Sequence, residues 1–289
     1  MKIQFIVCGW WYDEWDGKKN QTEFIDALYE LKEENENLDV MWTCHKTPPK
    51  IITEKFDYKE YENIGLEWGA YDKVLNDMDL DDDTFLFFIQ DDMVVHDWSF
   101  INICVDHFNL NPTTKVIGNG WNYPWDINPL EEARLSYWLK NGYNWRDYAK
   151  EENKHLYEEP LQCWSMRGSF FASKMKYIRE VGGFDYVNFP LIEMPDGSDS
   201  RDPNGNTSEY LNGYKFTKVF GQQGMKYLSD QYRFSKYMTE CGAGQVRLKY
   251  EEPPLDNYRM RVSLGRECNE RYNISRWTRV KIVSINKNI

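Results

Sequence analysis

The sequence predicts an α/β fold, in which a central sheet is flanked by helices. Short apolar runs alternate with segments of helical spacing over the first 118 residues. Strands separated by helices of this length pair in parallel through right-handed crossovers. The chain has 289 residues, enough to bury one large core. Because ligands of such sheets lie beyond the carboxyl ends of the strands, we expect the functional residues there.

The first half of the chain supplies the regular elements of the predicted sheet. Apolar residues at helical spacing predict a helix over residues 23–34, EFIDALYELKEE. The apolar run TFLFFIQ at residues 84–90 predicts a strand that is buried on both faces. The other expected strands are 3–8, 38–43 and 115–118, and the other expected helices are 63–75 and 98–108.

The second half is less regular and divides by charge. Residues 119–160 are rich in aromatic rings, and residues 196–208, DGSDSRDPNGNTS, are predicted to form a loop or lid. The chain has a net charge of −12, but residues 226–289 carry 13 Lys and Arg against 7 Asp and Glu. We therefore expect a main domain at residues 1–225 and a basic extension at residues 226–289. The acidic body argues against electrostatic wrapping of nucleic acid, although the basic extension can meet phosphates locally.

Composition also indicates the class of ligand and the cellular location of the protein. Aromatic residues make up 16% of the chain, which favours a surface that stacks on flat ligands such as sugars or bases. The 6 cysteines form no C-x-x-C pair and no zinc-binding spacing, which is typical of reduced thiols. The apolar run at the start is too short for a signal peptide, and no segment is long enough to span a membrane. These features predict a cytoplasmic protein.

The sharpest local feature is the end of the strand at residues 84–90, where Gln90 is followed by Asp91 and Asp92. Carboxylates at the end of a buried strand are costly unless something neutralises them, and a hard divalent cation does so. Mg²⁺ or Mn²⁺ is therefore the expected cofactor. The alternative is that these acids cap the next turn or lie in solvent, as we expect for the acids at residues 81–83.

Two further segments carry a family resemblance. ENIGLEWGA at residues 62–70 precedes the acidic strand, and MRGSFFASK at residues 166–174 leads to IREVGGFD at residues 178–185. With the Gln-Asp-Asp segment, this order resembles the GT-A glycosyltransferases, particularly glycosyltransferase family 2. That family has an N-x-G-x-x-x-A segment, a D-x-D strand, a strand-helix unit that leads to G-G-F-D, and then an E-D pair whose acid is the catalytic base. The resemblance covers residues 1–225 and implies a GT-A mixed sheet flanked by helices.

The resemblance assigns the metal and the base. Asp92 matches the last acid of D-x-D and would hold the metal at the donor diphosphate, whereas Gln90 stands in place of the first acid. Glu209, the next acid in a helical segment, matches the catalytic base, and Asp185 is the nearer rival. The acids of the 193–199 loop also stay open as the base, and they are Glu193, Asp196 and Asp199.

The nucleotide and sugar subsites follow from the same comparison. After the second strand the family often has an acidic pair, but this chain has Thr43-Cys44-His45, so its base contacts differ. A UDP-sugar is the expected donor. The residues expected to bind it are Cys8, Gly9, Trp10, Thr43, His45, Asn63, Gly69, Gln90, Asp91, Gly168 and Ser169.

The implied function is metal-dependent transfer of a hexosyl or pentosyl group from a nucleoside-diphosphate sugar to an acceptor hydroxyl, with inversion. A cation stabilises the charge on the departing diphosphate, and a carboxylate takes the proton of the attacking hydroxyl. The acceptor is a glycan or, in an alternative, a modified base in DNA, as in phage-type DNA glycosylation. A third hypothesis is a nucleotide-sugar or glycan-binding module of weak activity, since Gln90 replaces an acid.

Overall fold

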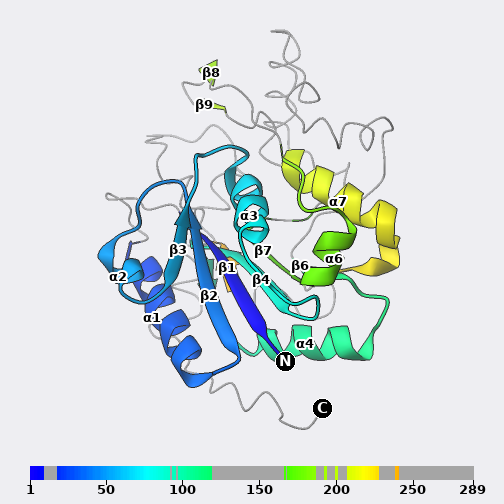
Figure 1. Ribbon diagram of the computed structural model, residues 1–289, viewed down its shortest axis with the longest axis horizontal. Coiled ribbons are helices and arrows are strands. Elements are labelled where there is room, and N and C mark those ends of the chain that lie inside the picture. Colours follow the sequence, from blue (N-terminus) through cyan, green and yellow to red (C-terminus); the bar gives the residue numbers. More distant parts are fainter. Residues whose placement is uncertain are drawn as a thin grey trace.

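The structure is a computed structural model. It describes residues 1–9, 18–91, 93–95, 97–118, 166, 168–186, 192–193, 199–200, 207–227 and 238–240. In this part of the chain the core is a seven-stranded mixed sheet with the order β10-β6-β7-β4-β1-β2-β3 (Figure 1). Its strands are β1 (Ile3–Gly9), β2 (Leu38–Cys44), β3 (Asp57–Glu60), β4 (Phe85–Gln90), β6 (Val116–Gly118), β7 (Phe170–Lys174) and β10 (Met225–Tyr227).

Helices cover both faces of this sheet. They are α1 (Lys18–Glu34), α2 (Lys50–Thr53), α3 (Leu66–Asn76), α4 (Phe100–Leu110), α6 (Met175–Glu180) and α7 (Thr207–Phe220), with a short 3₁₀ helix at Gln222–Gly224. Every strand and helix predicted within residues 1–118 is present, and α2, β3 and the short strand β5 (Met93–Val95) were not predicted. The mixed sheet flanked by helices confirms the predicted fold class.

The two faces of the sheet form two apolar cores because side chains alternate along each buried strand. On β1, Phe5 and Val7 face one core, whereas Ile6 and Cys8 face the other. The first core includes side chains of α1, α2 and α4, and the second includes those of α3, α6 and α7. Central strands buried on both faces explain why their sequences are continuous apolar runs.

β1, β2 and β4 run in parallel as predicted, and β7 is an antiparallel strand of the mixed sheet. β1 pairs in parallel with β2 and β4, and β10 with β6, but β7 is antiparallel to both β4 and β6. The run of apolar residues identifies a strand without giving its direction. β7 leads directly into α6, where the Met175 amide donates to the Thr84 carbonyl at 3.0 Å.

The start of α3 also differs, because the helix begins at Leu66 and not at residue 63. Gly65 has φ 80° and Leu66 has φ 51°, so two consecutive residues adopt left-handed conformations before the helix. Leu66 is strained there, since only glycine enters this region at no steric cost. A side chain on Gly65 would also collide with the Tyr186 ring.

Three smaller features lie in the second half. Within the predicted loop at 196–208, Asp199–Ser200 forms β9, which pairs with β8 (Ile192–Glu193), and α7 already begins at Thr207. The loop is therefore shorter than predicted. β11 (Met238–Glu240), from the basic extension, pairs antiparallel with β5 (Met93–Val95). The edge strand β10 (Met225–Tyr227) spans the boundary that we expected between the main domain and the basic extension.

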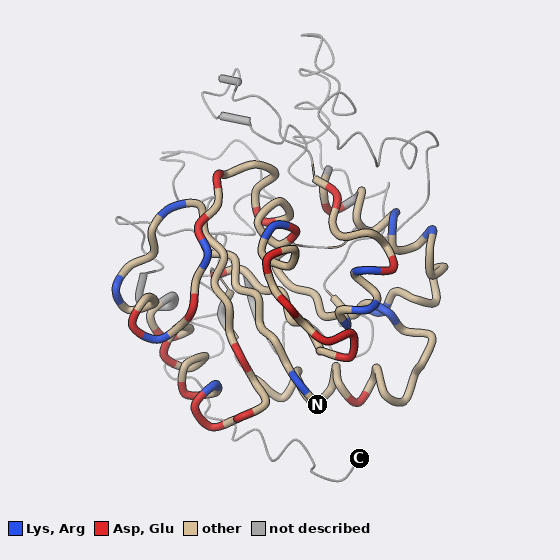
Figure 2. Tube along the Cα trace, in the orientation of Figure 1, with Lys and Arg blue, Asp and Glu red and all other residues tan. Residues whose placement is uncertain are grey.

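Charge and hydropathy add two observations on the described residues. Basic side chains gather around α6 and the end of β7, where Lys174 lies near Lys115 and Lys176 (Figure 2). No helix in the described ranges is both long and apolar enough to cross a membrane.

The aromatic segment at 119–160 lies outside the described residues.

Candidate functional site

The ends of three parallel strands place several predicted residues side by side. Cys8 on β1 is the register partner of Thr43 on β2 and of Gln90 on β4. The Asp91 amide donates to the Cys8 carbonyl at 3.0 Å, which holds the residue after β4 against the end of β1. The Thr43 hydroxyl lies 3.4 Å from the Ala70 carbonyl of α3. The structure therefore brings these predicted residues together at the carboxyl edge of the sheet.

The turn at Gly168 and Ser169 joins this edge to two helices. The Gln90 amide donates to the Ser169 carbonyl at 3.2 Å. The Tyr71 hydroxyl of α3 donates to the Gly168 carbonyl at 3.0 Å, and the Gly168 amide donates to Oε1 of Glu209 on α7 at 3.2 Å. The structure thus brings Glu209, predicted from motif order, into contact with the turn beside the strand end.

Gly168 also contacts an acid that sequence reasoning missed. A methyl group on Gly168 would lie 2.6 Å from Oε1 of Glu67, which explains why this position lacks a side chain. Glu67 and Tyr71 are four residues apart on α3 and so lie on the same side of the helix. The N-x-G-x-x-x-A segment contains Glu67, but its pattern leaves that position open.

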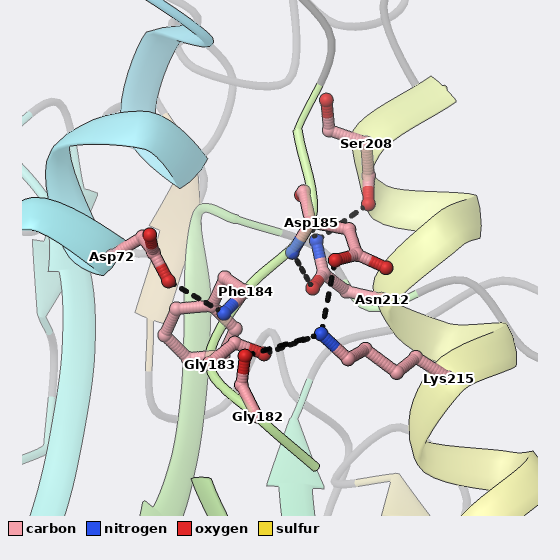
Figure 3. A network of polar contacts seen from close by, with 8 residues as sticks. All are labelled: Asp72, Gly182, Gly183, Phe184, Asp185, Ser208, Asn212 and Lys215. Carbon is pink, nitrogen blue, oxygen red and sulfur yellow. Dashed lines mark hydrogen bonds and ion pairs between the residues drawn. The ribbon is translucent and has the colours of Figure 1, made fainter. Parts of the chain in front are cut away.

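Asp185 lies in a buried polar network between the G-G-F-D turn and α7 (Figure 3). Its carboxylate pairs with Lys215 at 2.9 Å, and the two side chains are 0% and 3% exposed. Lys215 also donates to the Gly183 carbonyl at 3.0 Å. The Asn212 side chain bonds both to the amide and to the carbonyl of Asp185, at 2.9 and 2.7 Å. Asp185 is therefore tied to α7 through both its side chain and its backbone.

One side of α7 carries all of these contacts. Ser208, Glu209, Asn212 and Lys215 are buried, and Glu209, Asn212 and Lys215 recur every three residues, so they lie on one side of the helix. Sequence reasoning found Glu209 but not Asn212 or Lys215. Their spacing from Glu209 was the available signal, because polar residues on the apolar side of a helix must find partners in the interior.

The N-x-G segment packs closely against its own helix. A methyl group on Gly69 would lie 1.7 Å from the Ile64 carbonyl oxygen, so this position requires glycine. Both polar atoms of the Asn63 side chain are buried, and they have no hydrogen-bond partner among the residues that the structure describes. The same holds for the Ser169 hydroxyl, in a residue that is 2% exposed. Buried polar groups of this kind fit a ligand that supplies the missing hydrogen bonds.

The electrostatics of the edge are negative. Burial, Glu60 and Asp91 together raise the pKa of the Cys44 thiol to about 12. Cys44 is the register partner of Gly9 and of Glu60, so these carboxylates act at the carboxyl ends of β1, β2 and β3. A negative field of this kind suits a cation, although the described ranges contain no group of three or more metal-ligating side chains.

Some predicted residues lie outside the described ranges or away from the turn. Asp92, Trp10 and Asp196 are outside the described residues. His45 follows β2, and its Nδ1 lies 3.3 Å from the Tyr61 carbonyl oxygen. Glu193 and Asp199 are register partners in the β8–β9 hairpin.

Comparison with known proteins found similar solved structures but no matching sequence. No protein-family model matches the chain, and no curated protein has a matching sequence. One similar structure is glucosyl-3-phosphoglycerate synthase from Mycobacterium tuberculosis in complex with Mn²⁺, UDP and glucosyl-3-phosphoglycerate. Its TM-score is 0.42 at 10% identity, and the match covers 78% of this chain and 68% of that chain. Another is mannosyl-3-phosphoglycerate synthase from Rubrobacter xylanophilus, with a TM-score of 0.40 at 10% identity, covering 78% and 64%.

A third similar structure is CMP:2-keto-3-deoxy-manno-octonic acid synthetase with CTP. Its TM-score is 0.40 at 8% identity, and the match covers 78% of this chain and 89% of that chain. The chain therefore spans a smaller share of the two phosphoglycerate enzymes than of the synthetase.

Proposed function

We propose that this chain is a metal-dependent glycosyltransferase that moves a hexosyl or pentosyl group from a nucleoside-diphosphate sugar to an acceptor hydroxyl. The observation that carries the proposal is the Gly168–Ser169 turn. Its two residues contact the end of β4 on one side and the Glu209 carboxylate on the other. Such a transfer requires a group that holds a cation and a carboxylate that acts as base. The two aspartates after β4 are candidates for the first, and a carboxylate on a separate helix is a candidate for the second.

Asp92, with Asp91 beside it, is our candidate for holding Mn²⁺ or Mg²⁺. Burial is the main cause of the raised pKa of Cys44, and the Glu60 and Asp91 carboxylates raise it further, so negative charge lies at this edge and supports a cation there. When bound, the cation would stabilise the negative charge that grows on the departing diphosphate. Gln90, in place of the first acid, would donate or accept a hydrogen bond to the sugar or ribose.

Glu209 is our candidate for the base that takes the proton of the acceptor hydroxyl. Its carboxylate accepts from the Gly168 amide, which fixes its orientation next to the strand end. Asp185 is held in a buried ion pair with Lys215, so we propose that it fixes α7 in place and does not take the proton. Attack from the side opposite the diphosphate would invert the anomeric centre.

The donor would lie across the ends of β1, β2 and β4. We propose that Cys8, Gly9 and Thr43, with His45 beyond β2, contact the nucleotide of a UDP-sugar. Asn63 and Ser169 would hydrogen-bond the donor or acceptor, since both have buried polar atoms without described partners. Gly69 acts indirectly, because it allows the N-x-G segment to lie against α3.

We further propose that residues 226–289 form an extension that closes over the catalytic part at residues 1–225. The pairing of β11 with β5 supports this arrangement, because β5 begins one residue after Asp92. The register places Glu240 opposite Met93, so the extension contacts the chain directly after the aspartates.

The proposal is tested by nucleotide-sugar binding and breakdown. In a thermal-shift screen with Mn²⁺, a UDP-sugar should raise the melting temperature more than other nucleotide sugars do, because ligand binding stabilises the folded state. With Mn²⁺ the protein should also slowly release free nucleoside diphosphate from that donor. Binding without release would identify a binding module, and no shift with any nucleotide sugar would contradict the proposal.

A further inference from the structure

We infer that Asn212 is a positioning residue for Glu209, because it holds the first turn of α7 against the G-G-F-D turn and so keeps the Glu209 carboxylate beside Gly168. This inference rests on the proposed function, in which Glu209 takes the proton of the attacking hydroxyl. It adds a residue to which neither the motifs nor the family resemblance assigns a role. Asn212 acts through Glu209 and does not itself contact the reacting atoms.

The Asn212 side chain binds backbone groups with both its donor and its acceptor. Its Oδ1 accepts from the Asp185 amide at 2.9 Å, and its Nδ2 donates to the Asp185 carbonyl at 2.7 Å. Nδ2 also donates to the Ser208 carbonyl at 2.8 Å, so both of its hydrogens are used. The side chain is 0% exposed. A side-chain amide offers a donor and an acceptor at one position, which aspartate or leucine of similar volume does not.

The bond to Ser208 connects Asn212 to the candidate base. α7 begins at Thr207, so Ser208 and Glu209 lie in its first turn, and the ends of helices fray. Asn212 ties this first turn to the next turn of the helix and, through Asp185, to the G-G-F-D turn. Glu209 lies three residues before Asn212 on the same side of α7, so a displacement of the first turn moves its carboxylate.

The G-G-F-D turn is a fixed support for this clamp, because α3 holds it from the other side (Figure 3). Asp72 of α3 accepts from the Phe184 amide at 2.8 Å. Gly183 has φ 79°, and a methyl group on it would lie 2.6 Å from Oδ1 of Asp72, so the turn fits closely against the helix. Asn212 therefore anchors the start of α7 to a segment that has its own attachment to the core.

The contacts form a closed ring that contains the candidate base. α3 holds the Gly168 turn through Tyr71 and the G-G-F-D turn through Asp72, and these two residues are neighbours in the sequence. α7 holds the same two turns through Glu209 and Asn212. Removal of the Asn212 side chain opens this ring at the next contact along α7 from Glu209.

The position of a base matters more for turnover than for donor binding. A general base must come within about 2.6–3.2 Å of the proton donor, and a misplacement of about 1 Å can lower the rate by a factor of about 100. The proposed donor contacts lie at the ends of β1, β2 and β4, on elements that the Asn212 side chain does not bind. Loss of Asn212 should therefore lower kcat and leave the donor KM unchanged.

The experiment measures release of UDP from UDP-glucose, UDP-galactose and UDP-N-acetylglucosamine by the full chain with Mn²⁺. Water takes the place of the acceptor hydroxyl, so the assay needs no acceptor. The variants are Asn212→Ala, Glu209→Gln and the double variant. The matched control is Asn109→Ala, at an exposed asparagine of α4. Urea unfolding checks that each variant is folded, and Asn212→Ser, which keeps one hydroxyl donor, replaces Asn212→Ala if the latter does not fold.

We expect Asn212→Ala to lower kcat by a factor of about 10 or more with an unchanged donor KM, whereas Asn109→Ala should behave as wild type. Asn212→Ser should show a smaller loss of kcat than Asn212→Ala. In the Glu209→Gln background, Asn212→Ala should cause little further loss, since residues that act as one unit have non-additive effects. A merely structural role would lower kcat by the same factor in both backgrounds.

Three results would overturn the inference while leaving the proposed function intact. The first is a folded Asn212 variant with the kcat of wild type. The second is an equal loss in both backgrounds, or a loss that falls on the donor KM. The third is undiminished release by Glu209→Gln, because the base would then be another residue. If the wild-type protein releases no nucleoside diphosphate from any nucleotide sugar, both the inference and the proposed function are wrong.

Discussion

The acids at the two ends of the sheet differ in burial and in partners. At the amino edge, Asp82 pairs with Arg179 and Asp83 with Lys176, and the two carboxylates are 63% and 80% exposed. In the candidate site, Asp185 and Glu209 are buried and bond to an internal lysine and to a backbone amide. The amino-edge acids lie in solvent as the sequence predicted.

The difference shows why the same residue type has different consequences in the two places. An exposed ion pair contributes little to stability, because water screens it and two long side chains must be ordered. A buried carboxylate is costly unless its partners are complete, so such residues persist where a fixed geometry is needed. Substitutions at the two ends should therefore differ in size.

The largest effect is expected from Lys215→Met, which leaves Asp185 buried without its cation. Removing one partner of a buried pair costs about 3–5 kcal/mol of unfolding free energy. The matched amino-edge variant Arg179→Met should cost about 0–1 kcal/mol. Urea unfolding of both variants measures the contrast. Equal losses would show that the Asp185 pair is no more important than a surface pair.

Glu209→Gln should have the next largest effect, on turnover. Its amide oxygen still accepts from the Gly168 amide, so the fold should persist. Loss of a positioned base should lower turnover by a factor of about 100 or more, with donor affinity kept. Steady-state kinetics measure this, with Glu180→Gln, an exposed acid of α6, as the control. Retained turnover would move the base to Asp185 or to the 193–199 loop.

A smaller effect concerns pH. The pKa of Cys44 is raised to about 12 in the folded protein, whereas the unfolded thiol titrates near 9.0. Above about pH 9 the unfolded chain loses this proton first, so stability should fall as pH rises toward 12. Cys44→Ala should make that fall shallower in urea unfolding at several pH values. An unchanged slope would mean that the pKa of this thiol is not raised in the folded protein, either by burial or by Glu60 and Asp91.

Much of the fold followed from the sequence, because apolar periodicity marks buried strands and amphipathic helices directly. The resemblance assigned Cys8, Thr43 and Gln90 to one donor site, and the structure makes them register partners on neighbouring strands. The direction of β7 did not follow, since an apolar run has the same appearance in either direction.

The partners of the candidate base could not be predicted because they are distant from it in the sequence. The contact of Gly168 with Glu209 joins residues 41 positions apart, and that of Gly168 with Tyr71 joins residues 97 apart. Nothing local marks such pairs. Glu67 was missed because the motif specifies only Asn63, Gly65 and Gly69 around it, and Lys215 because a lysine on a helix is ordinarily exposed.

The central claim is that the carboxyl edge binds a nucleotide sugar through a cation held at Asp92. Calorimetric titration of the donor into wild type and Asp92→Ala, with and without Mn²⁺, tests it most directly. We predict that wild type binds the donor tightly only with Mn²⁺, and that Asp92→Ala keeps its fold but loses this metal-dependent binding. Unchanged donor affinity of Asp92→Ala in Mn²⁺ would contradict the account.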